Sequence, residues 1–461
     1  MSENQKKGNL IAIVTMFALY GMVGFVTNLA APLGDVWKAQ PGINGSNTLG
    51  MMGNTMNFLA YLIMGIPAGR MIMKLGYKTT ALIAIACGFG GIFVQWLSGE
   101  VLLGASLAGI PANFFVYLVG AFICGFCVCM LNTVVNPMLN TVGGGGKRGN
   151  QLNMAGSSIN SLAGTAAPIV LGALIGEALK KLEAARLAGT TADVSVSDVN
   201  LVMYIAMAIF AVSFAVIAML PFGDAGRVSV HGETVPTFSP LKFRHCRLGV
   251  LGIFCYMGIE LGIPSMLFFW LKDGPLAELA KTTPGLVPAA VAGSVVGTYW
   301  FLMLVGRLVG STIGGKISSR TMLAATTGTG LLLVIVGVMT TRVGVVMPVF
   351  TGNFSGMSSL FAMQQVPLTA LLFVLCGLCT SIMWASTFNL AVEGLGKYTA
   401  PASGLFMTMV FGGAVFPQLQ STIADKCGYM ASYVVPGFCL AYLCVYALFF
   451  SKNVNTDIKV D

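Results

Sequence analysis

The sequence predicts an all-α membrane protein with twelve transmembrane helices in two pseudo-symmetric six-helix halves. Three observations predict this fold. The 461 residues are 56% hydrophobic and 9% charged, whereas soluble proteins carry about 25% charged residues. The apolar residues fall into twelve stretches close to the ~20 residues that cross a bilayer. Finally, patterns in the first six stretches recur in the last six.

The twelve stretches are separated by polar loops and give the expected helices in chain order. We expect spans at residues 10–33, 48–69, 77–98, 112–142, 150–176, 199–222, 247–271, 289–316, 320–340, 366–396, 400–424 and 430–451. An even number of spans places both chain ends on one side of the membrane. The polar start of the chain leads directly into the first span without a cleavable signal pattern, so that span is expected to stay in the mature protein.

The distribution of Lys and Arg predicts the orientation. Of the 25 basic residues, sixteen lie on the side of the termini, eight lie on the opposite side, and Arg307 lies within a span. Because basic residues concentrate in cytoplasmic loops, both termini are expected in the cytoplasm. The net charge of +9 therefore reflects topology, and the scattered cations form no nucleic-acid patch.

Repeated patterns divide the chain into two halves joined by a basic cytoplasmic loop. The loops after the second and eighth spans each carry two cations four residues apart, and matches at similar offsets link spans four and ten and spans five and eleven. Parallel repeats of this kind are typical of major facilitator transporters, whose substrate site lies between the halves near mid-membrane. The predicted boundaries are 1–222, 223–246 and 247–461.

The cysteines and histidines do not indicate a metal site or an enzyme. Most of the eleven cysteines lie inside apolar spans, and neither of the two Cys-x-x-Cys pairs has a nearby histidine. They are expected to pack as small apolar side chains. No metal, no cofactor and no catalytic residue is expected, and the chain contains neither a Gly-x-Ser-x-Gly motif nor a cluster of intramembrane acids.

Glu260 is the leading candidate for function because it lies in the middle of the apolar stretch 255–271. A charged group at this depth costs at least ~2.5–3.5 kcal/mol on insertion scales, so it should face a partner or a water-filled cavity. A desolvated carboxylate can exchange a proton near physiological pH. Glu260 is therefore expected to carry the coupling proton or to accept a substrate hydroxyl. The alternative is a structural pair with Arg307 or with a helix end.

Amide side chains in two spans predict a site for a neutral, polyhydroxylated ligand. Asn132 and Asn136 share one face of span four with Asn140, and Ser157 and Asn160 form a similar face on span five. Amides supply both donors and acceptors, which suits sugar hydroxyls. The alternative for each residue is hydrogen bonding between helices.

Aromatic and further amide residues extend the predicted substrate site. Trp384 lies in the middle of span ten, away from the interfaces where tryptophans usually anchor. Its indole face can pack against the C–H face of a pyranose while its N–H seeks a hydroxyl. Asn389 lies on nearly the opposite side of the same helix. Asn28 and Tyr256 complete the set of candidate substrate-binding residues.

Several of these stretches resemble known families. The loop 69–78 resembles the conserved loop motif of the major facilitator superfamily, although Met73 replaces the usual acid, and Arg307 matches a position in the eighth helix of that superfamily. More narrowly, three stretches resemble the fucose–proton symporter family, which includes bacterial glucose/galactose transporters. They are 132–137, 381–398 and 412–417.

The resemblance implies import of a small neutral sugar by cation-coupled symport, with a proton as the preferred ion, through alternating access in a bacterial inner membrane. The acids of proton-coupled fucose transport align with Asn28 and Asn132, which cannot carry a proton. Glu260 resembles the helix-seven glutamate of several glucose-type members, so it is the expected coupling acid. Sodium coupling, uncoupled facilitation, transport of an amino or acidic sugar, and a membrane-embedded enzyme are the alternatives.

The remaining basic residues are expected to hold or gate the two halves. Arg307 is expected to form a gating or structural ion pair, although it could instead bind an anionic substrate. The loop cations are expected to bind helix ends and acids on the cytoplasmic side; they are Lys74, Lys78, Lys316 and Arg320. The expected partners are a sugar, a coupling H⁺ or Na⁺ and the lipid bilayer, and the protein is expected to be a monomer.

Overall fold

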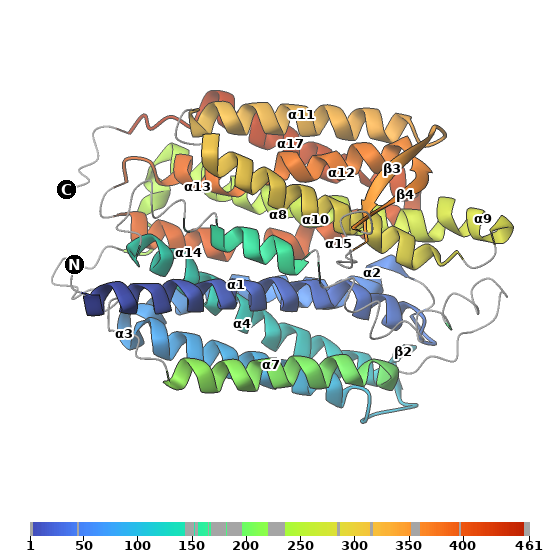
Figure 1. The fold of residues 1–461 in the computed structure, drawn as a ribbon, viewed down its shortest axis with the longest axis horizontal. Helices are drawn as coiled ribbons and strands as arrows, with labels where there is room; N and C mark the ends of the chain where they lie inside the picture. Colours follow the sequence, from blue (N-terminus) through green and yellow to red (C-terminus); the bar gives the residue numbers. More distant parts are fainter. Residues whose placement is uncertain are drawn as a thin grey trace.

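Long helices run side by side along one axis of the molecule (Figure 1). The computed structural model describes residues 3–43, 46–142, 152, 155–164, 166, 181, 196–219, 236–283, 286–313, 317–351, 360–395 and 398–455. Within these ranges, nine helices are long and apolar enough to cross a membrane. The predicted multi-pass helical fold is confirmed.

The first half of the chain supplies the lower layer of helices in Figure 1. Its elements are α1 (Glu3–Lys38), α2 (Asn47–Gly50), α3 (Met52–Leu97), β1 (Ser106–Leu107), β2 (Ile110–Pro111), α4 (Ala112–Val142), the 3₁₀ helix η1 (Val196–Val199) and α7 (Asn200–Met219). Within α3, Gly76 adopts φ 81° and separates the predicted second and third spans. Glycine adopts this left-handed conformation without steric cost, so the chain reverses there. Residues 155–164 form a helical part of the predicted fifth span.

The second half supplies the remaining helices, several of them in two pieces. Its elements are η2 (Ser239–Lys242), α8 (Arg244–Asp273), α9 (Pro275–Thr282), α10 (Pro288–Ile313), α11 (Ser319–Met339), β3 (Gly344–Phe350), β4 (Phe361–Pro367), α12 (Leu368–Thr380), α13 (Met383–Val392), α14 (Thr399–Met409), α15 (Gly412–Cys427), α16 (Tyr429–Ser432), α17 (Val434–Val445) and the π-helical η4 (Tyr446–Phe450). The predicted tenth span corresponds to α12 and α13, and the eleventh to α14 and α15.

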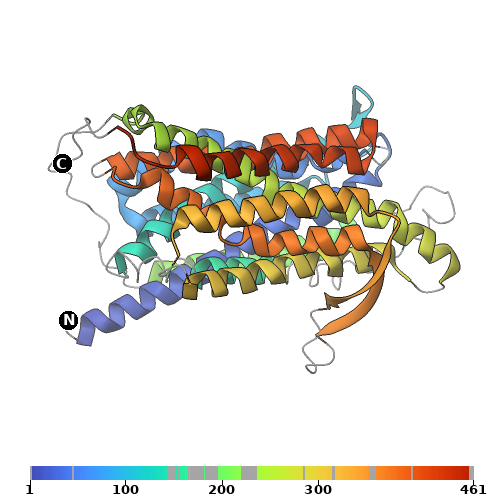
Figure 2. The same ribbon diagram turned by 90° about the horizontal axis from the view of Figure 1, so that it is seen from above.

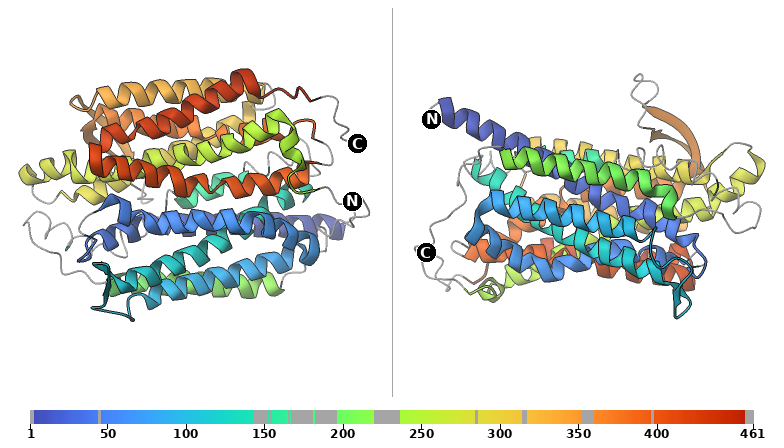
Figure 3. Two further views of the ribbon diagram at one scale, coloured as in Figure 1. Left: turned by 180° about the vertical axis from the view of Figure 1, so that it is seen from behind. Right: turned by 90° about the horizontal axis from the view of Figure 1, so that it is seen from below.

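Two β-hairpins add to the helical architecture that the sequence predicts. Strands β1 and β2 form a short antiparallel pair, and β3 pairs with β4 over seven residues each. Figure 2 shows the β3–β4 hairpin slanting sideways from the bundle. Both hairpins lie at the end opposite the chain termini, as the views from behind and below also show (Figure 3). The predicted boundary between the halves, 223–246, lies partly outside the described residues.

One type of contact, between a basic side chain and the carbonyl end of a helix, occurs in each half. Lys78, at the start of the third span, donates through Nζ to the carbonyl oxygen of Ala218 near the end of α7 at 2.8 Å. Arg320, at the start of the ninth span, donates through Nε to the carbonyl oxygen of Ala447 near the chain's last helical turn at 2.9 Å. Cations favour the exposed carbonyls at helix C-termini. Both cations bind helix ends, but each of these two contacts lies within its own half and does not connect the halves.

The halves approach closely where α3 meets α14. A Cβ placed on Gly65 would lie 2.6 Å from Thr408 Oγ1 and 2.8 Å from the backbone nitrogen of Thr408. Small residues allow transmembrane helices to pack this closely. The two halves therefore meet directly at this contact between α3 and α14.

Candidate substrate and coupling site

A buried ion pair lies in the middle of the second half. Arg307 on α10 and Glu260 on α8 are 3.4 Å apart between Nη2 and Oε1, and their side chains are only 9% and 12% exposed. An unpaired charge at this depth is costly, and a hydrogen-bonded partner offsets much of that cost. The ion pair between Glu260 and Arg307, which was the alternative to a transport role for Glu260, is therefore formed in this conformation.

Arg307 also reaches across to the first half. Its Nη1 donates to the carbonyl oxygen of Ser157 at 2.6 Å and to Ser161 Oγ at 2.7 Å. The planar guanidinium has five donors in a fixed fork and can serve several acceptors at once. Arg307 thus connects Glu260 in one half with the helix 155–164 in the other.

Two buried tyrosines surround Glu260 within the second half. Tyr256 lies one turn before Glu260 on α8, and its hydroxyl is 3.5 Å from the carbonyl oxygen of Thr380. The Tyr299 hydroxyl is 3.5 Å from the carbonyl oxygen of Glu260. The Tyr299 hydroxyl lies 3.1 Å from Thr380 Oγ1. Trp384 contacts the Tyr256 ring edge-to-face at a centroid distance of 5.8 Å. The structure therefore brings Tyr256, Glu260 and Trp384 together.

The predicted amide face of span four forms a chain of hydrogen bonds in the first half. Asn132 Nδ2 donates to the Tyr61 hydroxyl at 2.8 Å. Asn136 Nδ2 donates to the carbonyl oxygen of Asn132 at 2.8 Å, and the Tyr20 hydroxyl donates to Asn136 Oδ1 at 2.5 Å. Both asparagines are half-buried. They link α1, α3 and α4 through side-chain hydrogen bonds.

Asn160 carries an acceptor without a partner among the described residues. Its Oδ1 is buried and makes no hydrogen bond. The backbone of α1 approaches it closely, because a Cβ on Gly24 would lie 2.5 Å from that oxygen. A buried amide oxygen without a partner loses its hydration, so a hydroxyl that reached it would gain a hydrogen bond.

The structure does not bring every predicted residue to this site. Asn389 is half-buried farther along α13, and Lys74 is exposed. The side chains of Asn28 and Asn140 lie outside the described part of the structure, as does Lys316. Sequence reasoning missed Tyr20, Tyr61 and Tyr299. Their positions in the middle of apolar spans were the available signal, because a buried tyrosine hydroxyl usually needs a partner.

At the end opposite the termini, an ionic network connects the halves. Lys38 at the end of α1 lies 3.6 Å from Asp273 Oδ2 at the end of α8. Lys38 Nζ also donates to Asn47 Oδ1 at 2.5 Å. The Tyr429 hydroxyl donates to Asp273 Oδ2 at 2.7 Å and accepts from Asn47 Nδ2 at 3.1 Å. This closes a ring of four side chains between the two halves.

A second carboxylate, that of Asp425, adds hydrogen bonds between the halves at the same end of the molecule. Asp425 at the end of α15 accepts hydrogen bonds from Thr48 N at 3.0 Å and from Thr48 Oγ1 at 2.7 Å. Two turns deeper, Thr55 Oγ1 donates to Gln418 Oε1 at 2.8 Å. The structure therefore shows the two halves bound together on the side away from the termini.

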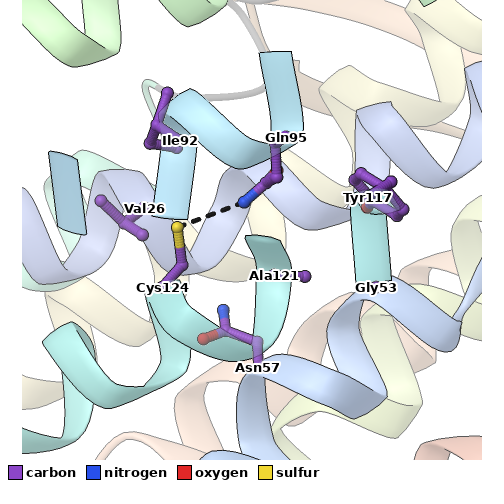
Figure 4. Close-up of a pocket in the computed structure, with 8 residues that line it drawn as sticks. All are labelled: Val26, Gly53, Asn57, Ile92, Gln95, Tyr117, Ala121 and Cys124. Atoms are coloured by element: carbon purple, nitrogen blue, oxygen red, sulfur yellow. Dashed lines mark hydrogen bonds between the residues drawn. The ribbon is translucent and has the colours of Figure 1, made fainter. Parts of the chain in front are cut away.

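A small cavity lies inside the first half and is separate from the inter-half site. Its volume of about 10 Å³ is about that of one water-sized probe, which is too small for a sugar. Figure 4 shows Gln95 directed toward Cys124 across it, with Nε2 and Sγ 3.2 Å apart. Eight residues line it: Val26, Gly53, Asn57, Ile92, Gln95, Tyr117, Ala121 and Cys124.

Full-length relatives share this fold. The chain is 27% identical over 452 residues to the glucose/galactose transporter of Brucella abortus, covering 98% of this chain and 96% of the relative. It is 28% identical over 450 residues to the putative glucose/galactose transporter of Helicobacter pylori, with coverages of 96% and 98%. A crystal structure of the fucose–proton symporter of Escherichia coli matches with a TM-score of 0.66 at 20% identity, covering 97% of this chain and 100% of that one.

No protein-family model matches the chain. The chain nevertheless has the fold of multi-pass transporters of the major facilitator class, and the relatives that it resembles over nearly its full length are transporters rather than enzymes. Within that class, the chain is related to the bacterial glucose/galactose transporters and to the fucose–proton symporter. The resemblance inferred from the sequence is confirmed.

Proposed function

We propose that this protein imports a small neutral sugar by proton-coupled symport with alternating access. The observation that carries the proposal is the position of Arg307, which pairs with Glu260 and donates to Ser157 and Ser161 of the opposite half. A group that binds both halves beside a buried carboxylate can link the protonation state to the arrangement of the halves. The names of the relatives favour a sugar as the substrate.

The chemistry around the ion pair suits a hexose or deoxyhexose. The amides of Asn132, Asn136 and Asn160 and the tyrosine hydroxyls provide uncharged donors and acceptors for sugar hydroxyls. Trp384, held by Tyr256, offers an apolar ring for the C–H face of the sugar. These groups come from both halves, so a bound sugar would contact both.

Coupling in this proposal runs through the Glu260–Arg307 pair. A proton on Glu260 removes its charge and weakens its hold on Arg307. Arg307 is then held mainly by Ser157 and Ser161, which changes the balance of contacts between the halves. Release of the proton restores the ion pair. A proton and a sugar would thus be bound and released in the same cycle.

The two ends of the molecule have different roles in this cycle. In this conformation, Lys38, Asp273, Asn47 and Tyr429 hold the halves together at the end away from the termini. Import requires this end to open to the outside and then to close before release. We assign the termini to the cytoplasm of a bacterial inner membrane, from the distribution of basic residues.

The ion pair also favours a second candidate. If Arg307 keeps Glu260 charged throughout the cycle, Glu260 acts as an acceptor for a sugar hydroxyl, and transport is either sodium-coupled or uncoupled. The absence of acids at Asn28 and Asn132 is consistent with this alternative.

Uptake by purified protein in liposomes separates the candidates. A panel of radiolabelled sugars is offered with an imposed pH gradient and no sodium. Accumulation of one sugar above equilibrium is the expected result for proton symport. Equilibration without accumulation, or accumulation only with sodium, would support the second candidate. Uptake of none of the sugars would overturn the substrate class.

A further inference from the structure

The β3–β4 hairpin has an uncharged composition that a loop in water would rarely have. Strands β3 (GVVMPVF) and β4 (FAMQQVP) contain no Asp, Glu, Lys or Arg. In a hairpin exposed to water, the outward face is usually polar and only the inward face is apolar. The pairing of Val346 with Gln365 and of Pro348 with Met363 defines the outward face here. Apart from Gln365, that face is apolar.

The alternation of burial shows that one face packs on the protein and the other does not. Met347, Val349 and Val366 point inward and are at most 2% exposed. Val346 and Met363 point outward and are 58% and 64% exposed. The hairpin is therefore firmly packed on one side, and its apolar outer face is left without a protein partner among the described residues.

The hairpin runs back alongside the bundle rather than extending beyond it. The Phe350 ring stacks on Phe301 at 5.0 Å with an interplanar angle of 11°, and Phe301 lies near the middle of the 26-residue α10. Phe350 N also donates to Thr298 Oγ1 on α10 at 2.8 Å. Figure 2 shows the same sideways slant. The far ends of the strands thus lie beside α10 rather than beyond the end of the bundle.

We infer that the β3–β4 hairpin is an interfacial element that inserts its apolar outer face into the leaflet opposite the termini. Lipid is the proposed occupant because α11, which leads directly into β3, also exposes apolar side chains toward that end of the molecule, namely Leu332, Ile335, Val336 and Met339. The boundary between headgroups and acyl chains suits a hairpin, since water and headgroups there can satisfy the backbone groups at its edges.

Fluorescence quenching of a polarity-sensitive dye tests this inference. The three cysteines that are not buried, Cys87, Cys427 and Cys444, are replaced by serine. The dye is then attached at Met363→Cys on the outer face of the hairpin. Lys281→Cys, on the exposed and charged α9 at the same end of the molecule, is the matched control for a position in water. Both proteins are reconstituted into phosphatidylcholine–phosphatidylglycerol nanodiscs.

We expect lipids with a nitroxide near the top of the acyl chain to quench the dye at residue 363 at least ~3-fold more strongly than the dye at residue 281. Aqueous iodide should show the opposite order. Equal quenching by iodide at both positions would place the hairpin in water and overturn the inference. Protection of residue 363 from both quenchers would also overturn it, because a second protein copy would then cover the face. Val346→Cys, on the other strand, should repeat the result if Met363→Cys folds poorly.

Discussion

Arg307 Nη1 on α10 lies 2.7 Å from Ser161 Oγ on the helix 155–164, so a cation of the second half is bound by the first half. The same guanidinium is 3.4 Å from Glu260. Few contacts at this depth can hold two helical halves together and also respond to the charge of a neighbouring acid. This arrangement makes the buried pair the most informative place to perturb transport.

Substitution of Glu260 by Gln should abolish accumulation of sugar against its gradient while leaving counterflow exchange measurable. Glutamine keeps the size and the hydrogen-bonding capacity of the side chain but cannot carry a proton. Uptake and counterflow in liposomes under an imposed pH gradient measure the two activities. Glu393→Gln, at the exposed end of α13, is the control and should accumulate normally. Accumulation by Glu260→Gln at the level of the unmodified protein would exclude coupling through this residue.

Glu260→Gln should also lower thermal stability, because it leaves Arg307 buried without its counter-charge. Removing one partner of a buried pair typically costs ~3–5 kcal/mol. The double variant Glu260→Gln, Arg307→Gln should recover part of that loss, since neither site is then charged. Unfolding of Glu260→Gln, Arg307→Gln, the double variant and the parent in detergent tests this. A double variant less stable than both single variants would show that the two residues do not act as a pair.

Loss of the Tyr429 hydroxyl should loosen the closed end of the molecule. Tyr429→Phe removes the hydrogen bond to Asp273, which is worth about 1 kcal/mol, or roughly fivefold in the open population. A cysteine at Thr55, beneath the ionic network in a Cys427→Ser background, reports opening through its labelling by a membrane-impermeant maleimide. Labelling should become several-fold faster.

Tyr204→Phe is the control for that measurement. Its hydroxyl accepts a hydrogen bond from Trp96 Nε1 at 3.1 Å within the first half, so its loss should not change the labelling rate at residue 55. Equal rates in Tyr429→Phe and the parent would show that the network of Lys38, Asn47, Asp273 and Tyr429 does not control closure.

Gly65→Ala should impair transport because the added methyl group would press on the backbone of Thr408, 2.8 Å away. Overpacking of this kind typically costs 1–3 kcal/mol, and it acts at the contact between the halves. We expect the initial rate of uptake to fall about tenfold with normal insertion in the membrane. Gly69→Ala, one turn farther along the same helix, has no heavy atom within 4 Å of its new methyl group and should transport normally. Similar rates for both variants would contradict the close approach.

Much of the fold could be predicted from the sequence because membrane helices obey a strong local rule. Backbone groups in lipid must bond within their own segment, so length and apolarity alone predict the spans. The repeated cations at Lys78 and Arg320 predicted two related halves, and both bind helix ends. The β3–β4 hairpin escaped prediction. Its apolar, uncharged strands resemble parts of a span, and only their antiparallel pairing distinguishes them.

For the site, the sequence by itself determined which groups are available. Several side chains are polar although they lie in apolar spans, and this makes them recognisable as candidate functional residues. They are the carboxylate of Glu260, the guanidinium of Arg307, the amides of span four and the indole of Trp384. Which of them meet was decided by the tertiary structure alone. The pairing of Glu260 with Arg307, the reach of Arg307 to Ser161 and the closure at one end depend on how helices far apart in the chain are packed. Sequence periodicity gives the face of a helix, but the partner opposite that face is fixed only when the helices pack together.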